Sequence, residues 1–108
     1  MKYKIIHDQG EKYIQFNEKK YMGLQEMINT IHLHRITLED ILEKIKLIQT
    51  GVSNFEEIGT ERIMIEISVD GCEIYDLFED IIGKEDSFQR AEISLEELKG
   101  VILFLKNL

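Results

Sequence analysis

Hydrophobic and polar residues alternate along the segment from Arg62 to Asp70. Four β-branched residues point one way, while Met64, Glu66 and Ser68 point the other, which is the period of a half-buried β-strand. Asp70-Gly71 is a strong turn signal and predicts the end of this strand. The four residues on the predicted buried side are Ile63, Ile65, Ile67 and Val69.

The N-terminal residues form two short segments, KYKIIHD and YIQFN, which are rich in tyrosine and isoleucine. The turn-like sequence Gln9-Gly10-Glu11 separates them, so we expect a β-hairpin. The later segment VSNFEEIGTE has turn-forming residues and no sustained period, and we expect a loop there with at most one helical turn.

Helical spacing appears in three further segments. Apolar residues from Tyr21 to Ile31 predict a helix from about Met22 to about His34. Thr37 with Asp40, and Ser94 with Glu97, have the spacing of capping boxes, and each precedes an apolar stripe. Gly51 is expected to end the first of these two capped helices. In the terminal helix, apolar residues off the main stripe predict that the last two turns are buried on more than one side; they are Leu103, Phe104 and Leu108.

The segment CEIYDLFEDIIGKED, residues 72–86, combines six carboxylates with several large apolar residues. Its apolar positions, from Ile74 to Ile82, fall at i, i+3, i+4, i+7 and i+8, which predicts an amphipathic helix ended by Gly83. Its apolar side would face the core and its carboxylates the solvent. The first four residues, CEIY, could instead pair as a strand after the turn, and the sequence leaves this alternative open.

These elements predict one α+β domain spanning residues 1–108, in which a mainly antiparallel sheet of about three strands is packed by about four helices. No apolar run approaches the length of a membrane span, and no signal-peptide pattern is present. With a single cysteine, no intramolecular disulfide can form. We therefore expect a soluble cytoplasmic protein that does not contact a membrane.

The net charge of −8 is distributed unevenly. Between Phe55 and Asp86 there are eleven acidic and two basic residues, a balance of −9, whereas the rest of the chain has ten acidic and eleven basic residues, a balance of +1. This acidity argues against direct binding of nucleic acid, which requires clustered lysine and arginine. It favours a partner with a basic surface.

Candidate catalytic groups lack the surroundings that catalysis requires. His32 and His34 have no metal-ligand spacing, and no serine or glycine lies in a nucleophile or phosphate-binding motif. Cys72 lies among acidic residues, which should raise its pKa and disfavour the reactive thiolate. We therefore expect a protein that is not an enzyme and has no cofactor and no metal site.

The carboxylates of the predicted helix have three readings. Glu73, Asp76 and Asp80 would share one helical face, where they could be a solvated surface, a protein-binding patch or a cation site. The spacing is not that of an EF-hand. An acidic face with an exposed aromatic anchor such as Tyr75 suits docking onto a basic groove, because long-range attraction speeds encounter and the anchor slows release.

The strand, turn and acidic segment TERIMIEISVDGCEIYDLFEDIIG, residues 60–83, resembles in general character the small acidic immunity proteins of bacterial toxin–immunity systems. The resemblance implies a non-catalytic inhibitor that neutralises a cognate basic toxin, such as a nuclease, by occluding its active site. Two alternatives remain: a structural or regulatory module that acts as a homo-oligomer or adaptor, and a cation-dependent enzyme using the carboxylates. The predicted partner-binding residues are Glu73, Tyr75, Asp76, Glu79, Asp80, Glu85 and Asp86.

Overall fold

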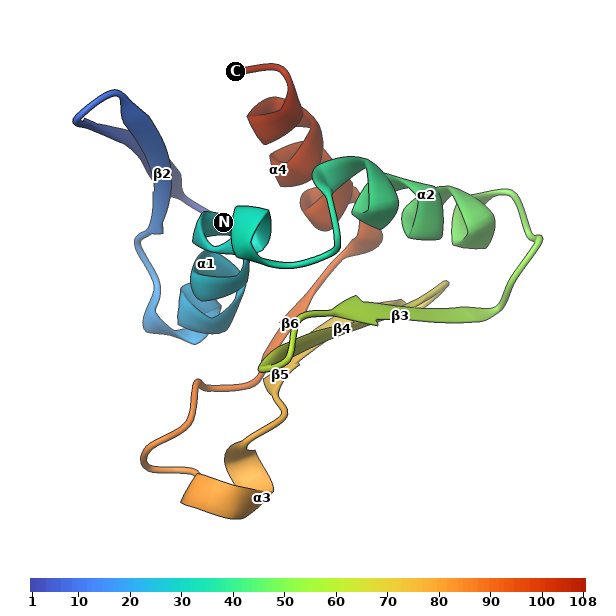
Figure 1. Ribbon diagram of the computed structural model, residues 1–108. Coiled ribbons are helices and arrows are strands. Elements are labelled where there is room, and N and C mark those ends of the chain that lie inside the picture. The colour runs from blue at the N-terminus through green and yellow to red at the C-terminus, as the bar shows by residue number, and fades with distance from the viewer.

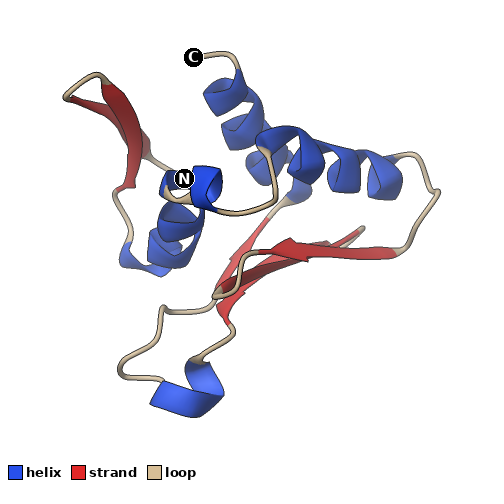
Figure 2. Ribbon diagram, viewed as in Figure 1, coloured by secondary structure: helices blue, strands red, loops and turns tan.

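The computed structural model describes residues 1–108 as a small α+β domain with four α-helices and two antiparallel sheets (Figures 1 and 2). The predicted fold class is confirmed, but six strands replace the expected three. None of the helices is long and apolar enough to cross a membrane. In chain order the elements are β1 (Tyr3–Asp8), β2 (Glu11–Phe16), the 3-10 helix η1 (Lys19–Tyr21), α1 (Met22–Asn29), the 3-10 helix η2 (Ile31–Leu33), α2 (Leu38–Gln49), β3 (Phe55–Gly59), β4 (Ile63–Ser68), β5 (Gly71–Asp76), α3 (Glu79–Ile82), β6 (Ala91–Ile93) and α4 (Leu95–Lys106).

The predicted N-terminal hairpin is present as the two-stranded sheet β1–β2. Its register pairs Tyr3 with Phe16 at one end and Asp8 with Glu11 at the other. The two turn residues, Gln9 and Gly10, have φ angles of 50° and 82°, the left-handed conformation that two-residue hairpin turns require.

Both predicted capping boxes are formed. The Asp40 backbone N–H donates to Thr37 Oγ1 at 3.1 Å, and the Thr37 backbone N–H donates to Asp40 Oδ2 at 2.8 Å. Ser94 and Glu97 make the same reciprocal pair at the start of α4. These bonds satisfy backbone N–H groups that the first helical turn leaves without partners, and so fix where α2 and α4 begin.

Two helix expectations need correction. The first helix ends at Asn29 rather than near His34, because the chain continues as the short 3-10 helix η2. The last turns of α4 are not buried on several sides: Leu103, Phe104 and Leu108 remain exposed. The physical reason is that the sheet and α2 pack against one side of α4, so its additional apolar residues are covered only in part, Phe104 by the Tyr3 ring of the hairpin.

The second sheet has four antiparallel strands in the order β3-β4-β5-β6. β4 confirms the predicted alternation, with Ile63, Ile65 and Ile67 buried, while Val69 lies exposed in the turn that follows. That turn is displaced by one residue from the prediction: Ser68 pairs with Gly71, so Val69 and Asp70 form the loop. The segment expected to be a loop contains β3, and the short strand β6 was not predicted.

The expected amphipathic helix over residues 74–82 is wrong. Residues 71–76 form β5, which pairs along its whole length with β4, and only the single turn Glu79–Ile82 is helical. The alternative strand pairing of CEIY is therefore the observed one. A strand that follows a tight turn finds the free backbone groups of β4 beside it, and this pairing outweighs the helical spacing of the apolar residues.

The core lies between the four-stranded sheet and helices α1, α2 and α4. Figure 1 shows these three helices on one side of the sheet, which we call the inner face, while α3 extends from the end of β5. The inner face carries isoleucines from β3, β4, β5 and β6, and α2 packs across β3 and β4. The opposite side, the outer face, has no long helix over it.

Candidate functional site

Four glutamates lie in register across the outer face of the four-stranded sheet. Glu57 on β3 pairs with Glu66 on β4, Glu66 pairs with Glu73 on β5, and Glu73 pairs with Glu92 on β6. We call these residues the glutamate row. Directly opposed residues have Cβ atoms about 5 Å apart, and like charges at this distance destabilise a sheet. The row therefore concentrates negative charge at a cost to stability.

Apolar and aromatic side chains lie on either side of the glutamate row. Phe55 at the start of β3 is 52% exposed. Met64 on β4 is paired with Tyr75 on β5, and both are half-buried. The Tyr75 hydroxyl donates a hydrogen bond of 3.0 Å to Glu66, which fixes the ring against the row. Burial, followed by the bond to Glu66, raises the pKa of Tyr75, so the hydroxyl stays protonated as a donor.

Arg90 closes one end of the outer face. Its Nη1 lies 2.5 Å from Glu73, its Nε donates to Glu79 on α3 at 3.1 Å, and its guanidinium lies over the Tyr75 ring at 4.7 Å from the centroid. Within the glutamate row, Glu73 thus has a basic partner. Glu57 and Glu92 form no ion pair.

The other end of the outer face is hollowed. A surface hollow of about 590 Å³ is bordered by residues of β3 to β6 and the start of α4. Five carboxylates and no basic side chain line it, so its charge suits a lysine or arginine side chain from another molecule. The five carboxylate residues are Glu66, Asp70, Glu73, Glu92 and Glu97.

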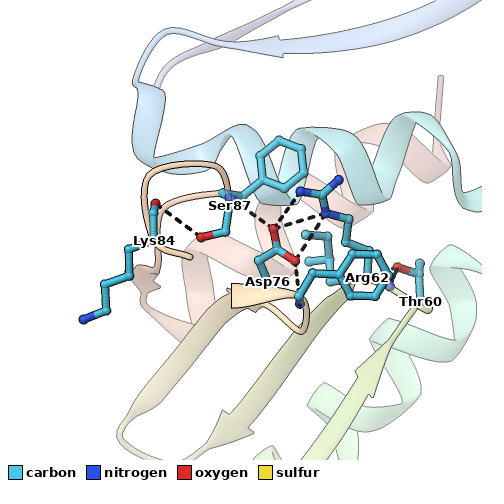
Figure 3. A network of polar contacts seen from close by, with 8 residues as sticks. Thr60, Arg62, Asp76, Lys84 and Ser87 are labelled. Atoms are coloured by element: carbon cyan, nitrogen blue, oxygen red, sulfur yellow. Dashed lines mark hydrogen bonds and ion pairs between the residues drawn. The ribbon is translucent and has the colours of Figure 1, made fainter. Parts of the chain in front are cut away.

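Asp76, predicted as a binding residue, lies instead on the inner side of β5 and is only 1% exposed. Its carboxylate accepts bonds from Arg62 Nε and Nη2 at 3.0 to 3.2 Å, and from the backbone N–H groups of Phe78 at 2.9 Å and Phe88 at 3.0 Å (Figure 3). Burial opposes its charge, yet these bonds outweigh burial, and the pKa of Asp76 lies below its usual value.

The role of Asp76 is therefore to hold the loop that contains α3. It joins both ends of that loop to Arg62, whose guanidinium also lies against the Phe78 and Phe88 rings, 5.4 and 4.7 Å from their centroids. The placement of Asp76 on one exposed face with Glu73 and Asp80 is wrong, because residues three apart on a strand point to opposite faces.

The remaining predicted residues separate into two groups. Glu73, Tyr75 and Glu79 are brought together by Arg90. Asp80, Glu85 and Asp86 are exposed on α3 and the loop after it, and make no ion pair with one another or with a base. Of the apolar residues expected to face the core in this segment, Ile74 is buried, whereas four others are exposed to solvent: Leu77, Phe78, Ile81 and Ile82.

Sequence reasoning missed Glu57, Glu66 and Glu92 as members of the candidate site. The alternation of β4 already placed Glu66 opposite the buried isoleucines. A two-residue turn after Ser68 would also have set Glu66 against Glu73, since the turn length fixes the register of a hairpin. Glu57 and Glu92 had no such signal, because the strands that carry them were not recognised.

The histidine, cysteine and carboxylate side chains are the candidates for a metal site, and Cys72 is the candidate for a reactive thiol. No group of three or more histidine, cysteine, aspartate or glutamate side chains is arranged to hold a metal ion. Cys72 is buried on the inner face, where burial first and then Glu96 raise the pKa of its thiol to about 11. Such a thiol is not a nucleophile at neutral pH.

No family model matches the sequence, and neither a curated protein nor a solved structure is significantly similar to the chain.

Proposed function

We propose that this chain is a non-catalytic binding protein whose outer sheet face docks onto a basic surface of a protein partner. The observation that carries the proposal is the in-register glutamate row on a sheet face without a helix over it. Basic side chains of a partner would relieve the repulsion between neighbouring members of the glutamate row. Association therefore recovers free energy that the isolated fold gives up.

The surroundings of the row suit a specific contact rather than diffuse attraction. Phe55, Met64 and Tyr75 offer apolar surface next to the charges, and aromatic residues are frequent anchors in protein interfaces. Tyr75 is held by Glu66 and Arg90 before any partner arrives, so little side-chain entropy is lost on binding. The carboxylate-lined hollow beside Phe55 provides a site for one inserted lysine or arginine.

In its more specific form, the proposal is that the partner is a toxin with a basic active-site groove and that this chain is its immunity protein. A groove that binds nucleic acid carries clustered lysine and arginine, which the glutamate row complements. A rigid acidic sheet seated in that groove excludes the substrate without performing any reaction. The acidity of the chain and its resemblance to small acidic immunity proteins support this form.

The test compares variants of equal net charge. In the outer-face variant, Glu57, Glu66 and Glu92 are replaced by glutamine; in the control variant, the same change is made at Glu26, Glu43 and Glu96, which are exposed on helices. The tagged proteins are used to capture partners from a lysate of the source cells at low salt, with elution in steps of rising salt. Association rates with the purified partner are then measured.

We expect the wild-type and control proteins to retain one basic protein that the outer-face variant releases at lower salt. Association of the outer-face variant should also be slower and less dependent on salt. If the captured protein is a nuclease or another toxin, adding the wild-type chain should abolish its activity. Equal loss of binding in both variants would contradict the site, because it would mean that total charge rather than the outer face is recognised.

A further inference from the structure

The two long edges of the N-terminal hairpin differ in how their backbone groups are satisfied. Along β2, the Asn29 side chain accepts from the Ile14 N–H at 2.9 Å and donates to the Ile14 carbonyl at 3.0 Å. The Gln25 side chain accepts from the Phe16 N–H at 2.9 Å. Side chains of α1 thus take the place of a neighbouring strand and close this edge.

The edge of β1 has no such cover. The backbone groups of Ile14 and Phe16 point away from β1. In an antiparallel pair of this kind, the backbone groups of the partners Ile5 and Tyr3 therefore point away from β2. The same holds for His7, because the direction repeats every two residues. None of the hydrogen bonds outside the regular elements, and none from a side chain, involves the backbone of these three residues. The outward N–H and C=O groups of these three alternate residues therefore form an open strand edge. The hairpin that carries it stands at one side of the molecule (Figure 1).

We propose that this edge binds the β1 edge of a second copy of the chain, antiparallel and across a two-fold axis, to form a symmetric dimer. With Ile5 opposite Ile5 of the second copy, Tyr3 faces His7 and His7 faces Tyr3. Every outward backbone group on both edges then gains a hydrogen bond, and the two hairpins become one four-stranded sheet.

Charge and hydrogen bonding together select this register. On the solvent-facing side, Lys2 lies opposite Asp8 of the second copy and Asp8 opposite its Lys2, which gives two ion pairs at the ends of the interface. Lys4 lies opposite Ile6. Shifting the strands two residues one way puts Lys4 opposite Lys4. Shifting them the other way places Lys4 opposite Asp8 and keeps two ion pairs, but it leaves only Ile5 and His7 to pair, so hydrogen bonds are lost.

Exposed apolar groups lie beside the edge that would be covered. Ile6 is 37% exposed on β1 although it lies in the middle of the strand. Phe104 on α4 is 45% exposed, and its ring contacts Tyr3 at 5.7 Å between centroids. A second hairpin placed along β1 would reduce the exposure of both, which adds hydrophobic stabilisation to the backbone bonds. The outer face of the four-stranded sheet plays no part in this contact.

The test exploits the paired charges. Sedimentation of the full chain from low micromolar to near-millimolar concentration measures the dimer dissociation constant for the wild type, Lys2→Asp, Asp8→Lys and the double variant with both changes. Each single reversal opposes like charges at both ends, whereas the double variant exchanges the charges and restores the ion pairs. Lys46→Asp on α2, which also lowers the net charge by two, serves as the control for Lys2→Asp.

We expect the mass to rise from 12.7 kDa toward twice that value with concentration. Each single reversal should weaken the dimer about tenfold, and the double variant and Lys46→Asp should remain near the wild type. By NMR, exchange of the Tyr3, Ile5 and His7 amides should slow as the dimer forms. A chain that stays monomeric throughout, or a dimer whose β1 amides remain unprotected, would overturn the proposal. Protection of those amides only on adding another protein would also overturn it, and would assign the edge to a different partner's strand.

Discussion

The two faces of the four-stranded sheet are built from neighbouring residues with opposite roles. On β5, Ile74 is buried while Glu73 and Tyr75 on either side of it belong to the outer face. Each face also has one arginine–carboxylate contact: Arg62 with Asp76 on the inner side and Arg90 with Glu73 on the outer side. A charge pair can thus be part of the fold or part of a surface, depending only on the face to which its strand residue points.

The difference follows from solvent access. The Asp76 side chain is fully buried and accepts hydrogen bonds from Arg62 and from two backbone N–H groups. Removing the carboxylate would leave these donors without an acceptor. Arg90 and Glu73 remain in contact with water, where ion pairs contribute little to stability. The inner face therefore contributes most of the stability, and substitutions on the outer face should change stability little.

The largest difference in the free energy of unfolding is expected between substitutions at two adjacent residues of β4. Ile65→Ala, at a fully buried position, should lower the free energy of unfolding by about 4 kcal/mol, since it removes apolar contacts and leaves a cavity. Glu66→Ala on the outer face should change it by less than about 1 kcal/mol. Urea unfolding followed by circular dichroism measures both. Equal losses would mean that the outer face also belongs to the core.

The two carboxylates of β5 give the next contrast. Asp76→Ala should cost about 3 kcal/mol, because the α3 loop loses its anchor and Arg62 its partner. Glu73→Ala should cost less than about 0.5 kcal/mol. Amide hydrogen exchange at Phe78 and Phe88 provides a local readout. Unchanged exchange of these amides in Asp76→Ala would show that something other than Asp76 holds the loop.

The stability contributed by Asp76 on the inner face should depend on pH. The folded-state pKa of Asp76 is depressed below the ordinary 3.8, so its contribution is present above pH 3.8 and is lost as the pH falls through the folded-state value. Asp76→Asn should be less stable than the wild type at neutral pH and should lose less stability on acidification below pH 3.8. Parallel curves of unfolding free energy against pH for the two proteins would refute a charged Asp76.

The smallest expected effect is a slight gain in stability. Glu57→Gln or Glu92→Gln removes one of the opposed charges in the glutamate row and should raise the free energy of unfolding by a few tenths of a kcal/mol, about the value of one cross-strand charge pair. The gain should disappear at high salt, where the repulsion is screened. Thermal unfolding at two salt concentrations tests this. Destabilisation at low salt would indicate favourable contacts of these glutamates within the fold.

The sequence allowed prediction of elements whose signals are local. Thr37 with Asp40 and Ser94 with Glu97 marked the starts of α2 and α4, because a capping box satisfies helix N–H groups within four residues. Alternation identified β4, and the turn residues identified the N-terminal hairpin. The strands β3 and β6 were missed because a five-residue and a three-residue strand contain too few alternations to form a pattern.

The segment from Cys72 to Ile82 marks the limit of local reasoning. Its apolar spacing fits a helix, yet β5 also satisfies alternation through Cys72, Ile74 and Asp76, and the two patterns overlap in one sequence. Only the neighbouring strand β4 distinguishes them, because a strand gains its hydrogen bonds from residues outside the segment whereas a helix gains them inside it. For this reason the prediction of an acidic helix was wrong, and so was the prediction that Asp76 lies on the surface.

By itself, the sequence determined the α+β class, the two capped helices, the first hairpin and the concentration of negative charge between Phe55 and Asp86. Only the tertiary structure decided which carboxylates meet. It buried Asp76 with Arg62, aligned four glutamates from four strands and left one edge of the hairpin open. Hydrophobic periods and caps act over a few residues, but strand register and burial depend on segments that are distant in the chain.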